Sequence, residues 1–417
     1  MSNNYENKQL SGVGVVYKFI EYFEKTFAAE TGEPMLEETS QFYLDLVALG
    51  QISDMMVHTT IENRYICEYG LSHINNGFFK ELVNKQSFSL GDKPLTQIGV
   101  AFYITPLINA LIRVGSIAEK TLLFEAFIDP YKLVQSTKRG ETDEEEYLAT
   151  QVARYCSNAK SRQDREMEKA FDILNIQIMD NCLDENKIII LNGDELGVPN
   201  TLTGLCAMKV AAHYKKPVIL GRTTPDGKFI KGSMRGRDGS ELKDFRSFLL
   251  GSGMVEYCEG HANAAGTGVK ISNIQKLTDY ANDALKDIDF NEKFFEADFI
   301  VKGNCSYLSD LITELDNGRT LWGQGNPEAM IIVENIPIVA DEIQIIGKNK
   351  DTLKFTFNGI TYIKFKAKSL IEDLQMFQGK LNLNIAGRGN INEWMGKKTP
   401  QILIDEIEIN EMNDFDF

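Results

Sequence analysis

Residues 258–266 hold the side chains best suited to contacting a charged ligand. They include two glycines, three alanines and one histidine. Small side chains let the backbone approach a ligand closely, and exposed backbone N–H groups can form a concavity for an anion. His261 can both donate hydrogen bonds and carry charge near pH 7. The stretch predicts a glycine-rich, anion-binding loop; the alternative is a tight turn with a packed histidine.

Two other positions could contact a phosphate directly. Asn109 and Arg113 lie four residues apart on a predicted helix. The guanidinium would offer a charged fork and the amide a neutral donor. The alternative is that the two side chains bond each other on the helix surface.

A lone carboxylate follows the apolar run at residues 43–53. Asp54 ends this run in a short loop, where an aspartate commonly makes a turn or a cap. The polar loop continues through His58, which we expect at the surface.

The elements around residues 258–266 follow a strand–helix–strand order. Apolar runs predict strands at 187–191 and 216–220, with a helix over 200–212 between them. This order implies a parallel pair in an α/β domain. Expected next are a strand at 227–232, a turn at 232–236, a helix closed by Gly251, a strand at 268–271, and a capping box at 272–275 that opens a helix.

Two longer regions flank this domain. Charge-rich residues from Glu144 to about Asp184 predict a long connecting helix. After Phe294, short alternating strands predict a small barrel, with Asn358-Gly359 as a hairpin turn. There, Lys354, Lys364 and Lys366 alternate with Phe355, Phe357, Tyr362 and Phe365. Proteins bind single-stranded DNA through lysine charges on its phosphates and aromatic rings stacked on its bases, so this pattern predicts a DNA-binding surface. The alternative is that the aromatic side chains fill the core of the barrel and the lysines protect a strand edge from pairing.

Composition constrains the remaining possibilities. The 417 residues carry a net charge of −16, which argues against a generally basic nucleic-acid-binding surface. Residues 345–400 nevertheless hold ten Lys/Arg against four Asp/Glu. The six cysteines lie far apart and predict reduced thiols in a cytoplasmic protein. No uninterrupted apolar run of membrane-spanning length occurs, so we expect no membrane contact.

Several motifs resemble the DHH phosphoesterase superfamily and, within it, the RecJ-like single-strand-specific DNA exonucleases. The likeness extends from about Leu10 to about Ile409. The motifs that carry it are Gly260-His261-x-x-Ala264-Ala265-Gly266, Gly232-Ser233-Met234-Arg235-Gly236, the loop ending in Asp54, the helix with Asn109 and Arg113, and Gly323-x-Gly325-Asn326-Pro327-Glu328. In the helical motif, Leu107 replaces an arginine of the family and Ile112 replaces a glycine.

The resemblance implies roles for individual residues. His261 and Arg235 would be the catalytic pair that grips a phosphate at the DNA end, and Asp54 a metal ligand. Substrate or phosphate contacts would come from Asn109, Arg113, Ser233, Gly260, Gly266, Lys354, Lys364 and Lys366.

The resemblance also implies two Mn²⁺ or Mg²⁺ ions, which suit phosphodiester hydrolysis. Their ligands in the family come from Asp-x-Asp, a lone Asp and Asp-His-His, ahead of a Gly-Val-Gly helix. Here that helix begins at Gly12, and the sequence has no Asp-His-His. We therefore expect an incomplete metal site, with Asp54 as its remaining ligand, and a missing N-terminal metal-binding segment.

The expected fold class is α/β: a partial DHH α/β domain, a long connecting helix, a DHH-associated α/β domain and an OB-type β-barrel. The boundaries are 1–140 for the C-terminal part of the DHH domain, 141–185 for the helix, 186–292 for the DHH-associated substrate-binding domain, 293–411 for the barrel and 412–417 for an acidic tail.

Three functions stay open from the sequence. The first is a RecJ-like 5′→3′ single-stranded DNA exonuclease of recombination, repair or replication, with this chain carrying mainly the substrate-binding part. The second is a non-catalytic single-stranded-DNA-binding subunit. The third is a DHH phosphodiesterase for short oligonucleotides. Expected partners are single-stranded DNA, a single-strand binding protein and a separate N-terminal catalytic segment.

Overall fold

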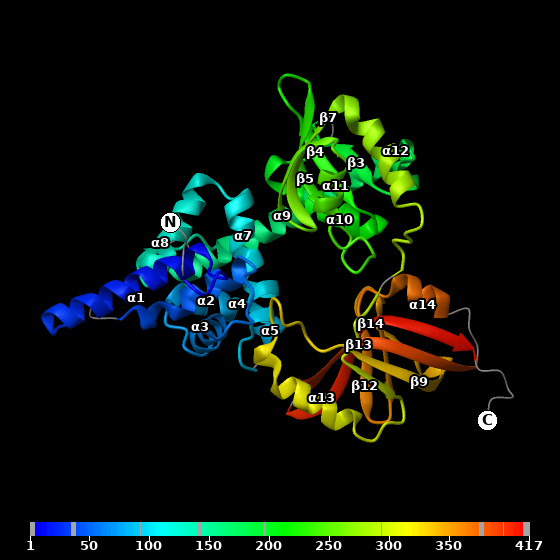
Figure 1. Ribbon diagram of the computed structural model, residues 1–417. Coiled ribbons are helices and arrows are strands. Elements are labelled where there is room, and N and C mark those ends of the chain that lie inside the picture. The colour runs from blue at the N-terminus through cyan, green and yellow to red at the C-terminus, as the bar shows by residue number, and fades with distance from the viewer. Residues whose placement is uncertain are drawn as a thin grey trace. The chain divides into compact units, whose positions relative to one another are not determined.

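The computed structural model describes residues 5–34, 39–91, 93–140, 144–194, 197–292, 294–374, 379–394 and 396–411. The chain forms two compact units, Met1–Thr105 with Phe295–Phe417, and Pro106–Phe294 (Figure 1). The acidic tail 412–417 lies outside the described residues, as do residues 141–143. The domain boundaries expected at residues 140, 185 and 292 stay predictions.

Helices build the first part of unit 1. They are α1 (Gly12–Thr31), η1 (Ser40–Tyr43), α2 (Leu44–Ser53), α3 (Ile61–Ser72), α4 (Gly77–Lys85), α5 (Ser87–Leu90), α6 (Gln97–Gly99), the π-helical η2 (Val100–Ile104) and α7 (Thr105–Val114), which continues into unit 2. The side chains of Ser11, Thr60 and Asn76 cap α1, α3 and α4 by accepting backbone N–H groups that a helix start leaves unpaired. A Cβ on Gly70 would lie 2.3 Å from the Leu44 carbonyl oxygen, so α2 and α3 pack in backbone contact.

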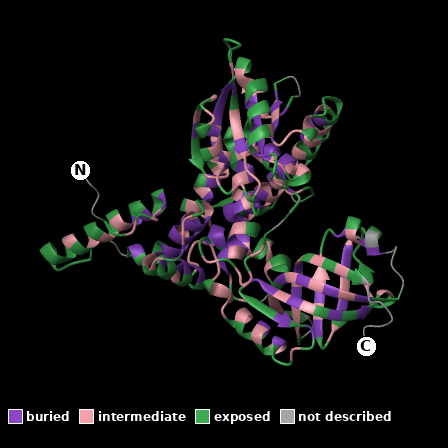
Figure 2. Cartoon of the chain, turned by 45° about the vertical axis from the view of Figure 1, so that its right-hand side comes forward, coloured by how far each residue is buried: buried purple, intermediate pink, exposed green. Residues whose placement is uncertain are grey.

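A seven-stranded sheet builds the second part of unit 1, in the order β10-β11-β12-β14-β13-β9-β8. Its elements are β8 (Phe299–Lys302), α13 (Leu308–Asn317), η6 (Arg319–Leu321), β9 (Ile331–Val339), η7 (Ala340–Glu342), β10 (Gln344–Ile346), β11 (Thr352–Phe357), β12 (Ile360–Lys364), α14 (Lys368–Leu374), β13 (Lys380–Trp394) and β14 (Lys397–Glu411). Buried and exposed residues alternate along its strands (Figure 2). The hairpin at Asn358-Gly359 is confirmed, with φ of 49° and 78°.

One short turn fastens these two parts of unit 1 together. Gly323 and Asn326 pair across the turn, and the Gln324 carbonyl accepts a 2.8 Å hydrogen bond from the His58 backbone N–H. A Cβ on Gly323 would lie 2.1 Å from the Gln97 Oε1 atom. The close packing of this glycine-rich turn therefore fixes the loop that follows Asp54.

Unit 2 is built around a five-stranded sheet in the order β3-β4-β5-β7-β6. Its elements are α8 (Ile117–Ile128), β1 (Leu133–Gln135), β2 (Glu145–Tyr147), α9 (Leu148–Asp180), η3 (Leu183–Glu185), β3 (Ile189–Asn192), η4 (Asn200–Leu202), α10 (Thr203–Tyr214), β4 (Val218–Thr223), β5 (Phe229–Arg235), α11 (Phe245–Gly251), β6 (Val255–His261), β7 (Ala264–Lys270), η5 (Ile271–Asn273) and α12 (Ile274–Ala284). The β3–β4 pair is parallel, as the strand–helix–strand order predicts, and the remaining pairs are antiparallel.

Four local predictions are wrong. The anion-binding loop at 258–266 is a hairpin, because alternate residues such as Cys258 and Ala265 bury against α11 and α12. The turn at 232–236 is largely strand β5. The connecting helix begins at Leu148 because residues 145–147 pair with β1. The capping box at 272–275 is replaced by a 3-10 turn, and no side chain caps α12.

The helical segments from α6 through α7 join into one continuous stretch, Gln97–Val114. Among the described residues, this helix is long and apolar enough to cross a membrane by length and composition alone. A buried core helix meets the same criteria of length and composition. Val100, Ile104, Ala110 and Leu111 are each fully buried, whereas Phe102 is 72% exposed and Ile112 50%, so one side of this helix belongs to the core.

His58 is buried at 3% exposure, not at the surface as expected. The turn at Gly323–Asn326 covers it, and its Nδ1 atom lies 3.2 Å from the Cys67 Sγ atom. Burial lowers the pKa of His58 to about 4 from an ordinary 6.5, because the charged imidazolium is poorly solvated there.

We predict that His58 makes the fold acid-sensitive between about pH 6.5 and 4. Below the ordinary pKa of histidine, His58 binds a proton in the unfolded chain but not in the folded chain. The free energy of unfolding therefore falls, by at most roughly 3 kcal/mol near pH 4. Unfolding in urea from pH 7 to 4 measures this loss. His58→Asn should flatten the profile while His73→Asn, at an exposed position, should not; equal profiles for all three proteins would contradict the assignment.

Candidate phosphate-binding site

The sheet of unit 2 has one fully covered side and one partly covered side. α11 and α12 cover the first with an apolar core. On the second, α9 and α10 cover β3 and β4 through residues such as Val218 and Leu220, and the start of α10 also reaches β5 at Ser233 and Arg235. Beyond that contact, the β5–β7–β6 part of this side remains open. Directly opposed residues share a face, so the open face consists of three rows: Arg235, Ala264 and His261; Ser233, Gly266 and Glu259; and Lys231, Gly268 and Tyr257.

Arg235 ends β5 where α10 begins. Its Nη1 atom donates a 2.7 Å hydrogen bond to the Met234 carbonyl. A Cβ on Gly204, in the first turn of α10, would lie 2.6 Å from the Arg235 Nη2 atom and 3.4 Å from the Ser233 Oγ atom. The glycine therefore leaves the space that the guanidinium occupies. The positive end of the helix dipole lies at the same place, with the Thr203 N–H bonded to the Asn200 carbonyl of the preceding η4 turn.

A second arginine adds to this positive charge. Burial, and next the charge of Arg113, lower the pKa of Arg235. The ion pairs between described residues include none to Arg113 or Arg235. Like charges beside a helix start destabilise one another unless an anion joins them, so this arrangement favours an anion-binding site. Asn109 lies one helical turn before Arg113 on α7, and no hydrogen bond between the two is recorded among described residues.

The residues in the middle of the open face have small side chains or none. A Cβ on Gly266 would have no neighbour nearer than 3.8 Å, so the protein itself leaves room there for a side chain. Gly260 differs: its φ is 138°, and a Cβ would lie 2.8 Å from the Ala264 carbonyl oxygen, so the hairpin requires glycine. The space over Gly266 is therefore available to a ligand, whereas Gly260 shapes the backbone.

Two residues orient the hairpin that carries His261. Asn263 donates to Asp238 Oδ1 at 2.9 Å, and its carbonyl accepts the Gly236 N–H at 2.9 Å. Arg246 donates to the Gly260 carbonyl at 2.7 Å. Both tie the hairpin to the segment around α11. His261 is exposed in the row that contains Arg235.

An aromatic and basic cluster continues the open face along the strands. The Lys231 Nζ atom lies 5.5 Å from the centroid of the Phe229 ring and 5.6 Å from that of Tyr257. The Tyr257 ring covers Gly268, where a Cβ would lie 2.7 Å from it. Lys231 lies two residues from Ser233, about 7 Å along the strand.

Asp54 lies in unit 1, at the C-terminal end of α2. It is exposed, and its backbone N–H bonds the Gly50 carbonyl at 3.0 Å. Among the described residues no three His, Cys, Asp or Glu side chains group closely enough to hold a metal ion. Two divalent cations need several oxygen or imidazole ligands, so the described residues do not form a two-metal site.

The three lysines predicted on the barrel do not share one face. The Lys364 Nζ atom donates to the Asp405 carbonyl at 2.8 Å. Lys354 pairs with Ile363 on the opposite side of the β11–β12 hairpin, and Lys366 is exposed after β12. Of the neighbouring aromatics, Phe355 and Tyr362 are buried and stack at 4.9 Å, whereas Phe365 is 62% exposed.

Comparison with known proteins identifies the family. The model of the RecJ OB domain matches residues 305–406. The putative SPbeta prophage-derived single-strand DNA-specific exonuclease YorK of Bacillus subtilis is 35% identical over 415 residues, covering 98% of this chain and 70% of that protein. The chain belongs to the RecJ-like family. The single-stranded-DNA-specific exonuclease RecJ of Bacillus subtilis is 26% identical, covering 99% of this chain and 48% of that protein.

Solved structures share the RecJ fold. RecJ of Thermus thermophilus in complex with Mn²⁺ matches with a TM-score of 0.68 at 18% identity, covering 98% of this chain and 55% of that chain. A mixed α/β RecJ-like fold with a C-terminal OB domain is thus confirmed. The chain spans about half the length of the two RecJ proteins.

Several residues that shape the candidate site were not predicted from the sequence. They are Gly204, Arg246, Asn263 and the cluster around Tyr257. The contacts that give these residues a role are made with neighbours elsewhere in the sequence. A signal existed only for Tyr257, which alternates with Glu259 and His261 on one strand face.

We predict that Gly204→Ala weakens phosphate binding without loss of folding. The added methyl group must displace the Arg235 guanidinium, whereas alanine stabilises a helix by up to about 1 kcal/mol over glycine. Calorimetric titration with thymidine 5′-monophosphate measures the affinity, and thermal unfolding measures the stability. Gly251→Ala, where a Cβ meets nothing within 4 Å, is the matched control. Affinity unchanged in Gly204→Ala would show that Arg235 does not bind the phosphate.

Proposed function

We propose that this chain is the substrate-holding part of a RecJ-like 5′→3′ single-stranded DNA exonuclease. Arg235 and Ser233 of its open face, together with Arg113 of α7, bind the terminal phosphate of the strand, with His261 beside the phosphate. The observation that carries the proposal is the Arg235 guanidinium in the space that Gly204 leaves at the start of α10, with no ion pair to Arg235 or Arg113 between described residues. After burial, the positive charge of Arg113 is the next cause that lowers the pKa of Arg235. Guanidinium forks suit phosphate oxygens in both charge and shape.

The strand continues from the phosphate over the open face. Gly266 lets the sugar-phosphate backbone lie close to the sheet. Tyr257 and Phe229 offer rings to a base, and Lys231 offers charge to the next phosphate. Sequence-independent binding of single strands combines these two features. Lys354, Lys364 and Lys366 of the OB domain would contact the strand farther on.

Hydrolysis would use Mn²⁺ or Mg²⁺, with Asp54 as one ligand. RecJ of Thermus thermophilus was solved with each of these ions. The remaining ligands must come from residues other than those described here, because no described group could hold a metal. We propose that a separate catalytic segment supplies them. Roles in DNA repair and recombination, contact with a single-strand binding protein, and a location in the reducing cytoplasm belong to the same proposal.

A binding-only accessory role is the second candidate, favoured by the same lack of a metal-holding group. Robust Mn²⁺-dependent release of nucleotides when a catalytic segment is added would exclude it. The OB domain at residues 305–406 counts against a phosphodiesterase of short oligonucleotides, since small substrates need no extended strand-binding surface.

We predict that Arg235→Gln and Arg113→Gln each weaken binding of a 5′-phosphorylated thymidine ten-mer at least tenfold, about 1.4 kcal/mol. Each removes one guanidinium from the phosphate. Fluorescence anisotropy at fixed salt measures the affinity. Arg165→Gln, at an exposed position on α9, is the control. Equal wild-type affinities for the 5′-phosphorylated and 5′-hydroxyl ten-mers would refute recognition of the terminal phosphate.

We also predict that Tyr257→Ala weakens binding of a 5′-phosphorylated dinucleotide but not of thymidine 5′-monophosphate. The ring would contact the nucleotide beyond the phosphate site, and stacking contributes about 1–3 kcal/mol per base. Tyr257→Phe keeps the ring and should bind as wild type does. Equal losses for both ligands in Tyr257→Ala would mean that the ring only supports the sheet at Gly268.

A further inference from the structure

The open face of unit 2 carries a carboxylate in its middle row. Glu259 lies on β6 directly opposite Gly266, in the same row as Ser233. It is exposed, whereas its neighbour Cys258 is buried in the core beside α11. Because successive residues of a strand point to opposite faces, the Glu259 side chain lies on the open face. A negative charge therefore stands on the surface that we propose for a nucleotide strand.

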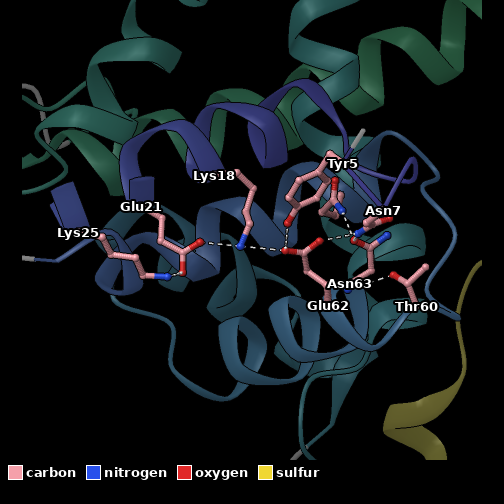
Figure 3. Close-up of polar contacts among 9 residues, drawn as sticks. Tyr5, Asn7, Lys18, Glu21, Lys25, Thr60, Glu62 and Asn63 are labelled. Atoms are coloured by element: carbon pink, nitrogen blue, oxygen red, sulfur yellow. Dashed lines mark hydrogen bonds and ion pairs between the residues drawn. The ribbon is translucent and has the colours of Figure 1, made fainter. Parts of the chain in front are cut away.

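The Glu259 carboxylate has no partner among the described residues. None of the hydrogen bonds and ion pairs between them involves it. Glu62 of α3 shows the contrasting arrangement. Its carboxylate oxygens accept hydrogen bonds from Tyr5 at 2.6 Å and from Asn7 at 2.8 Å, and the Lys18 Nζ atom lies 2.8 Å from one of them (Figure 3). The fold itself neutralises Glu62, whereas Glu259 can accept hydrogen bonds from a ligand.

Glu259 lies between the residues proposed for two successive phosphates. On β6 the open face presents His261, Glu259 and Tyr257 in order, with about 7 Å between successive members. Burial, and next the negative charge of Glu259, raise the pKa of Tyr257, so the carboxylate acts on this ring. In a strand, each sugar joins two phosphates. Between a terminal phosphate beside His261 and the next phosphate at Lys231, the first sugar would lie in the row of Glu259.

A carboxylate beside the first sugar favours a sugar with a free hydroxyl group. An ionised carboxylate repels phosphates and accepts hydrogen bonds without donating any. The first deoxyribonucleotide of a strand offers it no sugar hydroxyl, because the 3′-oxygen is esterified. A ribonucleotide offers its 2′-hydroxyl, the group by which proteins distinguish RNA from DNA. Carboxylates bind ribose hydroxyls in this way in dinucleotide-binding folds.

We propose that Glu259 accepts a hydrogen bond from the 2′-hydroxyl of the first nucleotide, so that the site prefers a 5′-phosphorylated strand that begins with a ribonucleotide. This rests on the proposed function, which supplies the positions of the terminal phosphate and the first sugar. Gly266 leaves the space for that sugar, since a Cβ there would have no neighbour nearer than 3.8 Å. The carboxylate thereby disfavours ends made of DNA alone.

The test compares three thymidine ten-mers that differ only at the 2′ position of the first nucleotide. All carry a 5′-phosphate, and the first sugar bears a hydrogen, a hydroxyl or a methoxy group at that position. Fluorescence anisotropy of the full chain, at fixed salt and with a chelator, measures the affinities. Wild type should bind the 2′-hydroxyl strand about fivefold more tightly than the 2′-deoxy strand, because a hydrogen bond to a charged acceptor is gained. The 2′-methoxy strand cannot donate and should bind no more tightly than the 2′-deoxy strand.

Glu259→Ala should bind the 2′-hydroxyl and 2′-deoxy strands with equal affinity, and thermal unfolding checks that this variant is folded. Glu256→Ala is the matched control. It removes a carboxylate from the same strand, at the β-bulge between Val255 and Tyr257 where residue 256 opposes no residue of β7. This control should keep the wild-type preference for the 2′-hydroxyl strand.

Three outcomes would overturn the inference: equal wild-type affinities for the 2′-hydroxyl and 2′-deoxy strands, a preference that persists in Glu259→Ala, or a 2′-methoxy strand bound as tightly as the 2′-hydroxyl strand. A Glu259→Ala variant that loses affinity only for thymidine 5′-monophosphate would instead assign the carboxylate to a free 3′-hydroxyl. Failure of wild type to bind any of the 5′-phosphorylated strands would sink the proposed function. Tight binding of all three without preference sinks only the role of Glu259.

Discussion

The packing of Arg235 against Gly204 is the contact on which the account of the site depends. It holds a guanidinium at the positive end of α10, within the electrostatic influence of Arg113. Neighbouring positive charges destabilise a fold unless a ligand neutralises them. The open sheet beside them is floored by Gly266, where the fold itself leaves space. Positive charge and unfilled space on the sheet thus lie next to each other. A terminal phosphate followed by a nucleotide strand requires both.

A second constraint acts on unit 1. The glycine-rich turn at Gly323–Asn326 fixes the loop after Asp54, and the Lys18 ion pairs fix the orientation of α1. Both act on segments next to α2, whose C-terminal cap is Asp54. Taken by itself, unit 2 offers hydrogen-bond donors for an anion, and unit 1 carries Asp54, the ligand that we propose for a metal ion. Neither unit needs the other to keep its local geometry.

The sequence predicts those features that depend on neighbours along the chain. The Asn358-Gly359 hairpin and the parallel β3–β4 pair follow from turn chemistry and from strand–helix–strand order. The β6–β7 hairpin could not be predicted, because glycine and alanine disfavour strands and only burial against α11 and α12 compensates. The burial of His58 and the approach of Arg235 to Gly204 depend on residues distant in sequence. The resemblance named the candidate site residues, which stay predictions, and the packing around them is visible only in the structure.

We propose above all that the chain binds the terminal phosphate through its own arginines, without a metal ion. The most direct measurement is a crystal structure of the full chain with a 5′-phosphorylated trithymidylate, grown in the presence of a chelator. We expect the 5′-phosphate within hydrogen-bonding distance of the guanidinium groups of both Arg113 and Arg235, with the next sugar over Gly266. A phosphate bound elsewhere, or either arginine paired with a carboxylate of the chain, would contradict it.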